Sequence, residues 1–261
     1  MALLGASLLS ASLQAQSTEA DLKARLADRL VYLRGCWDSG KLHFDSSGKL
    51  LSKSSQVSTT LCGFDPKKVQ LENNKLVLRG SRVGLAFVDN QLKPVNLDKS
   101  LQVEIDASSS GDYSPALDSI FAYHFADMVP LLPAYLQGYA QKGAQTTPST
   151  QSVAPVDPNA EHPVKFNVKN PSGITPPVLI KSAEPEFSGL LRGIQYNGTV
   201  VVRLWIERDG TPSHLSIERP AGLGLDENAL AAIQQYRFKP AMQNGKPVLV
   251  ELKVEVNFQR Y

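Results

Sequence analysis

The clearest pattern of hydrophobic and polar positions lies near the C-terminal end of the chain. Between Val248 and Gln259, apolar residues alternate with mostly polar ones. Because successive side chains of a strand point to opposite faces, this alternation predicts an antiparallel strand with one dry face. The residues of that face are Val248, Val250, Leu252, Val254, Val256 and Phe258.

Two further strands and a helix precede this strand. Residues 198–206 alternate in the same way, Asp209–Gly210 predicts a hairpin turn, and a second strand follows that ends near Arg219. Apolar residues then recur along one side of a helix that Asp226 is expected to cap. These elements predict an α+β fold for residues 176–261, with a three-stranded antiparallel sheet packed against helices.

The N-terminal part has a different texture. A leucine at every fourth position from Leu22 to Leu30 predicts a helix that Ser17 or Thr18 could cap. Short runs rich in β-formers follow, separated by Gly, Ser, Asn and Asp, and then come apolar stretches of helical character. We therefore expect a small β-rich domain with helices over residues 17–143.

Proline marks the boundary between the two regions. Residues 144–177 hold seven of the seventeen prolines, with many Thr, Ser, Gln and Asn. This composition predicts an extended linker over residues 144–175. The alternative interpretation is a Pro-rich loop folded over the second domain.

The extreme N-terminus and the cysteines bear on localisation. Residues 1–15 are apolar and small but too few to span a bilayer, so they predict a signal peptide that ends near Ala15. An ordinary unstructured terminus is the alternative. In an exported protein, Cys36 and Cys62 are expected to form a disulfide, with two buried thiols as the alternative. We therefore expect a periplasmic protein.

No pattern in the sequence indicates catalytic chemistry. The histidines His43, His124, His162 and His214 lack metal-ligand spacing, and no nucleotide-binding or nucleophile motif occurs. The net charge of +2 gives no reason to expect nucleic acid. We therefore expect no enzyme activity, no cofactor and no metal; an enzyme within residues 17–143 is a remaining alternative.

A small sheet offers another kind of function. An exposed edge strand presents unpaired N–H and C=O groups to another chain, and proteins bind extended peptides in this way. Four or five backbone hydrogen bonds at about 0.5–1.5 kcal/mol each, less the cost of association, predict roughly micromolar binding.

The C-terminal motifs, taken in order, resemble a known family. A G-x-V strand, a D-G hairpin and an L-D-x-x-A-L helix are followed by an aromatic-Arg-aromatic-x-Pro hinge at 236–240 and by N-G-K-P-V before the last strand. Over residues 176–261 this series is similar to the C-terminal domain of the TonB family. The N-terminal domain loosely resembles a β-rich module that precedes TonB-type domains in some acidobacterial envelope proteins.

The resemblance implies a function in transport. Family members pair their last strand, here Val248–Phe258, with a box peptide of TonB-dependent outer-membrane receptors and supply energy for uptake. It also implies that Phe187 lies near the receptor contact, and that Tyr236, Phe238 and Pro240 form a hinge in which Phe238 and Pro240 lock the helix onto the sheet. Inner-membrane motor proteins and a homodimer are further implied partners. The alternatives are an envelope scaffold that binds another partner, and an inner-membrane-associated location.

Overall fold

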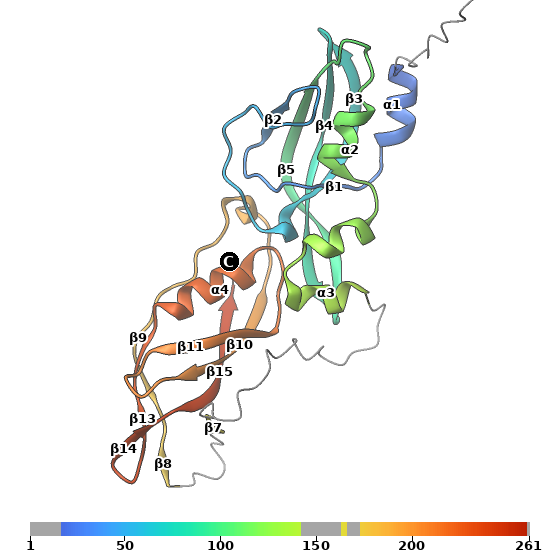
Figure 1. Ribbon diagram of the computed structural model, residues 1–261. Helices are drawn as coiled ribbons and strands as arrows, with labels where there is room; N and C mark the ends of the chain where they lie inside the picture. The colour runs from blue at the N-terminus through green and yellow to red at the C-terminus, as the bar shows by residue number, and fades with distance from the viewer. Residues whose placement is uncertain (1–16, 142–162, 166–172, 260–261) are drawn as a thin grey trace, which may run out of the picture.

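The computed structural model describes residues 17–141, 163–165 and 173–259 (Figure 1). The expected signal peptide and most of the expected linker lie outside the described residues. The chain is α+β, as the sequence predicts. It contains two hydrophobic cores, one built from the N-terminal domain and one built mainly from the C-terminal domain. In the described part of the chain, no helix is both long and apolar enough to cross a membrane.

The N-terminal domain is built on one six-stranded sheet. Long antiparallel strands form its centre, and helices pack along one face (Figure 1). In order across the sheet the strands are β2 (Lys41–Phe44), β5 (Gln91–Asp106), β4 (Lys75–Val88), β3 (Gly63–Glu72), β1 (Val31–Leu33) and β6 (Phe121–Ala122). The helices are α1 (Glu19–Leu26), α2 (Ser114–Ile120) and α3 (Ala134–Gln141), with the short turns η1 (Thr59–Leu61) and η2 (Phe125–Leu131).

The first helix begins where the sequence predicts. Of the two expected caps, Thr18 is the one used, because its hydroxyl accepts a hydrogen bond from the Asp21 amide and the Asp21 carboxylate reaches back to the Thr18 amide. This reciprocal pair satisfies two backbone donors at the helix start. Leu22 and Leu26 then point into the N-terminal core, which the leucine spacing predicts.

A disulfide closes the N-terminal domain. Cys36 and Cys62 are bonded, with their Cα atoms 5.0 Å apart, as the sequence predicts for an exported chain. Cys62 is the residue that ends η1. The bond therefore ties this short turn to the segment that follows β1.

The C-terminal domain has a mixed four-stranded sheet. Its order is β11 (Pro212–Arg219), β10 (Gly198–Ile206), β15 (Val250–Phe258) and the two-residue β7 (Val164–Lys165), which runs parallel to β15. The helix α4 (Leu225–Gln234) packs against the dry face of the sheet. Smaller pairings join β12 (Arg237–Lys239) with β9 (Val178–Lys181), and β14 (Lys246–Val248) with β13 (Ala241–Gln243) and β8 (Ile174–Thr175); η3 (Gly189–Leu191) precedes the sheet.

The last strand is shorter than the alternation suggests. Val248 belongs to β14, and β15 begins at Val250. Leu249 and Val250 are both buried, so the alternation of buried and exposed positions breaks at this point and the chain leaves one pairing for another. Val248 is therefore not part of the strand that the sequence places it in.

Candidate peptide-binding strand

The outer side of β15 is the feature on which a binding function depends. On its inner side β15 pairs with β10 along its whole length, from Val250 to Phe258. On its outer side, β7 pairs only with Val250 and Glu251. Within the described ranges, no other strand pairs with that side of residues 252–258. Among the described residues this stretch is therefore an open sheet edge, of the kind to which another chain can add a strand.

The contact with β7 shows which residues turn their backbone outward. The Val164 amide donates a hydrogen bond to the Leu249 carbonyl over 3.0 Å. Because successive residues of a strand direct their N–H and C=O groups to opposite sides, the odd-numbered residues of β15 face the open edge. The outward residues beyond β7 are Lys253, Glu255 and Asn257.

Apart from Val248, which belongs to β14, the expected dry-face residues lie where the alternation predicts, but their backbones face β10. Val250, Val256 and Phe258 are buried, whereas Leu252 and Val254 are only half-buried. These two half-buried side chains form an apolar shelf beside the open edge. Alternation in the sequence shows which side chains lie on each face of a strand. It does not show which backbone groups point to an unpaired edge, so it did not identify Lys253, Glu255 and Asn257.

The opposite face of β15 is polar. Lys253 forms an ion pair with Glu218 of β11, and Asn257 accepts a hydrogen bond of 2.8 Å from the Thr199 hydroxyl. Both pairings are solvent-exposed, so each stabilises the domain by no more than about 1 kcal/mol. Their main effect is to keep this face of the edge hydrophilic.

Phe187 reaches the end of β15 from outside the sheet. Its half-buried ring meets the buried ring of Phe258 edge-on, with centroids 5.3 Å apart and an interplanar angle of 78°. Such edge-to-face pairs are favourable beyond the area they bury. An aromatic side chain from a distant segment therefore lies beside the candidate strand.

The expected hinge residues join the end of α4 to the β10–β11 hairpin. The Phe238 ring is buried in the C-terminal core, and its amide donates to the Gly210 carbonyl at 2.9 Å. The Tyr236 amide donates to the Ile233 carbonyl at 3.0 Å, while Pro240 is half-buried. These contacts fix the exit of the helix against the sheet.

Asp226 does not cap α4, contrary to the sequence prediction. The N-cap position is Gly224, and Asp226 lies inside the first turn. Its buried carboxylate accepts hydrogen bonds from the amides of Ala221 and Gly222, at 2.7 and 3.0 Å. The carboxylate thus supplies acceptors for two amides of the loop before the helix, which need partners because that loop is itself buried.

The environment of Asp226 predicts a pH-dependent stability. Burial raises its pKa from 3.8 to about 7, although the two amide hydrogen bonds act in the opposite direction. A carboxyl group with a raised pKa in the folded state keeps a proton that the unfolded chain releases. The free energy of unfolding should therefore fall as the pH rises between about 4 and 7, by about 2 kcal/mol from pH 5 to pH 7.

Comparison with Asp226→Asn isolates this contribution. Both proteins are unfolded with urea across the pH range. From pH 5 to pH 7 the free energy of unfolding of the wild type should fall by this amount relative to that of the variant, since the asparagine does not titrate. Parallel stability curves would show that the Asp226 pKa is not raised.

Two comparisons with known proteins match the C-terminal domain. The family model of the Gram-negative bacterial TonB protein C-terminal region matches residues 183–259. A curated relative, Protein TonB of Vibrio cholerae serotype O1, is 26% identical over 85 residues, which is 32% of this chain and 35% of that protein. Residues 183–259 therefore form a TonB-family C-terminal domain, whereas the chain spans about a third of its relative's length.

Proposed function

We propose that this protein binds the box segment of TonB-dependent outer-membrane receptors by adding it as a strand to the outer side of β15. In this way it would support energy-dependent transport, as a non-enzymatic protein of the periplasm. The observation that supports the proposal most strongly is the open outer side of residues 252–258 in a TonB-family domain.

The backbone of the open edge accounts for a reversible affinity. Lys253, Glu255 and Asn257 each turn one N–H and one C=O outward. Hydrogen bonds to these groups contribute about 0.5–1.5 kcal/mol each, and the association cost offsets part of the sum. The result is binding in roughly the micromolar range.

The two faces of the edge favour one kind of peptide. Side chains of an added strand alternate between the apolar shelf of Leu252 and Val254 and the polar face that carries Lys253 and Glu255. A segment with apolar residues at every second position fits both faces. Phe187 adds an aromatic contact near the end of the strand.

An NMR titration of the full chain with receptor box peptides tests the proposal. The largest amide shifts and the strongest new protection from hydrogen exchange are expected at Lys253, Glu255 and Asn257. The amides of Val254 and Val256 face β10 and should change less. Saturation without changes along β15, or no saturation at all, would contradict strand addition.

Because β7 pairs with the first residues of β15, an incoming peptide would compete with β7 for the start of the edge. The Val164 amide is a donor to β15, and the Val164 side chain is 37% exposed, so little burial holds this strand in place. Val164→Pro removes that donor. If an incoming peptide must displace β7, the variant should bind it about fivefold more tightly, since one hydrogen bond contributes about 1 kcal/mol.

Val164→Ala is the matched control, because it changes the side chain and keeps the amide. Isothermal titration with one peptide should leave this control near the wild-type affinity. Equal affinities of the proline and alanine variants would show that peptides bind without displacing β7.

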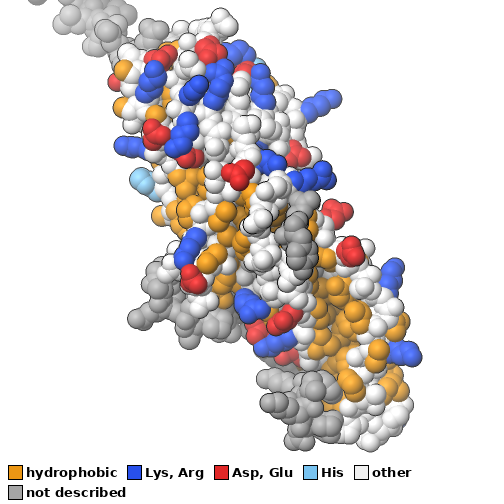
Figure 2. Space-filling model, turned by 180° about the vertical axis from the view of Figure 1, so that it is seen from behind, with side chains coloured by type: hydrophobic (Ala, Val, Ile, Leu, Met, Phe, Trp, Pro, Cys, Tyr) orange, Lys and Arg blue, Asp and Glu red, His pale blue; other side chains and the backbone are white. Residues whose placement is uncertain are grey.

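A scaffold function without energy transduction is the second candidate. It is favoured by an exposed apolar strand on the C-terminal domain, where Val178, Leu179 and Ile180 are 52%, 46% and 61% exposed. Figure 2 shows apolar side chains gathered along one side of this domain. A titration that leaves β15 unchanged would favour this candidate.

A further inference from the structure

The loop that leads into α4 and the first two residues of the helix are buried, at every position from Ala221 to Asp226. Loops normally run over the surface, because their backbone groups need partners. Here the N-terminal domain covers the loop, at the place where the β4–β5 hairpin and η1 meet the C-terminal domain (Figure 1).

Each amide from Ala221 to Leu225 has a hydrogen-bond acceptor, and two of these acceptors belong to the N-terminal domain. Asp226 accepts from two of them, and the Leu225 amide donates to the Gly222 carbonyl. The Leu223 amide donates to the Leu85 carbonyl of β4 at 2.9 Å, and the Gly224 amide donates to the Thr60 hydroxyl at 2.8 Å. Without the N-terminal domain, these last two donors would lose their partners.

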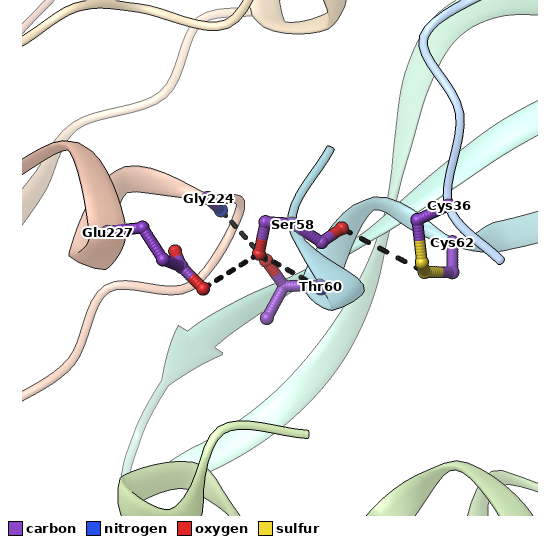
Figure 3. Close-up of a disulfide and its surroundings, with 6 residues drawn as sticks. All are labelled: Cys36, Ser58, Thr60, Cys62, Gly224 and Glu227. Carbon is purple, nitrogen blue, oxygen red and sulfur yellow. Dashed lines mark hydrogen bonds between the residues drawn. A yellow bond between two sulfur atoms is a disulfide. The ribbon is translucent and has the colours of Figure 1, made fainter. Parts of the chain in front are cut away.

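The N-terminal domain also donates hydrogen bonds to the C-terminal domain. The Phe87 amide of β4 donates to the Ala221 carbonyl at 2.8 Å, and the Ser58 hydroxyl donates to the Glu227 carboxylate at 3.0 Å (Figure 3). Gly222 has a φ of +78°, and a Cβ on it would lie 2.3 Å from the Leu85 carbonyl oxygen. The backbones of the two domains therefore approach as closely as neighbouring strands.

Apolar packing joins the same two surfaces. Leu61, Ala86 and Leu97 of the N-terminal domain are buried in the core of the C-terminal domain, where Leu223 and Leu225 also lie. Leu61 is 1% exposed. It belongs to η1, the turn that carries Thr60 and ends at the disulfide residue Cys62. The disulfide thus fixes the turn that supplies both an apolar and a polar contact.

We propose that η1 and the β4–β5 hairpin are a docking site for residues 220–227, and that the two domains form one body through it. The linking segment is then not the mechanical connection between the domains, and the Cys36–Cys62 disulfide holds η1 in the docking conformation. This gives the N-terminal domain a role as a fixed support of the TonB-family domain. The docked loop follows β11, at the opposite edge of the sheet from the outer side of β15.

Cleavage of the linking segment tests the docking. A specific protease site placed between residues 145 and 160 of the full chain allows the covalent connection between the two halves to be cut. The halves should co-elute from a size-exclusion column as one species at micromolar concentration. Elution as two folded fragments would overturn the proposal. Peptide binding is not part of this measurement, so its outcome is independent of the proposed receptor function.

Substitutions in the docking site test whether Leu61 and Thr60 hold the two halves together. Leu61→Glu places a charge in the interface and should weaken the association of the cleaved halves at least about 100-fold. Thr60→Val removes the acceptor for the Gly224 amide, together with the hydroxyl contact to Ser58 within η1, and should weaken the association about tenfold. Leu51→Glu changes a leucine that is 51% exposed and should have no effect. Unchanged association in both interface variants would overturn the assignment.

The double substitution Cys36→Ser with Cys62→Ser tests the anchoring role. In the cleaved protein it should weaken association of the halves about tenfold or more, while the circular dichroism of the N-terminal half remains that of a folded domain. An association as strong as that of the oxidised protein would show that the disulfide does not hold the docking turn.

Discussion

Glu255→Pro should weaken binding of a receptor box peptide at least about 100-fold and leave the protein folded. The Glu255 amide points to the open side of β15, so the substitution breaks no hydrogen bond within the sheet. Proline is tolerated on an edge strand when its missing N–H faces solvent. An incoming strand, however, loses a donor at the centre of the edge and meets the proline ring. Loss of two or three hydrogen bonds corresponds to about 3 kcal/mol.

Two controls separate the backbone effect from other causes. Glu255→Ala removes the same side chain and keeps the amide, so its affinity should stay near the wild-type value. Val254→Pro removes an amide that faces β10, where Val254 pairs with Val202, and should destabilise the sheet itself. Isothermal titration and circular dichroism of the three variants decide the matter. Full binding by folded Glu255→Pro would show that the peptide uses another surface.

These variants depend on a fact that alternation in sequence cannot supply. The pattern from Val250 to Phe258 gives the dry and wet faces of the strand correctly, because burial acts on side chains. Which backbone groups face the neighbouring strand depends on register, which is set by pairing with β10 and β7. The sequence therefore predicts the candidate strand but not the residues on which its binding capacity depends.

Asp226 illustrates the same limit for the helix. An aspartate just before an apolar helical run is a good N-cap from local sequence alone. The structure instead buries it beneath another domain, where it bonds to the loop amides of Ala221 and Gly222. Local propensity cannot report a contact with residues about 140 to 165 positions earlier in the chain, such as Thr60 and Leu85. A run of three glycine-spaced apolar residues, A-G-L-G-L, is the one local sign of a close approach.

Loss of the disulfide should have the largest effect on stability. The bond joins residues 26 positions apart, and closing a loop of this size stabilises a fold by about 3–4 kcal/mol through the unfolded chain. The double substitution Cys36→Ser with Cys62→Ser should lower the free energy of unfolding by this amount in urea. An unchanged urea midpoint would mean that the cross-link does not restrict the unfolded state.

The two tryptophans report whether removal of the disulfide destabilises one domain or both. Trp37 packs on Phe44 in the N-terminal domain, and Trp205 stacks on His214 in the C-terminal domain. The variants Trp37→Phe and Trp205→Phe each leave one fluorescent reporter. If docking joins the domains into one cooperative unit, both reporters should give the same urea midpoint, and removal of the disulfide should lower both together. A disulfide between residues 36 and 62 can stabilise the distant C-terminal sheet only through the docked loop. If its removal lowers the urea midpoint reported by Trp37 and not the one reported by Trp205, the domains unfold separately.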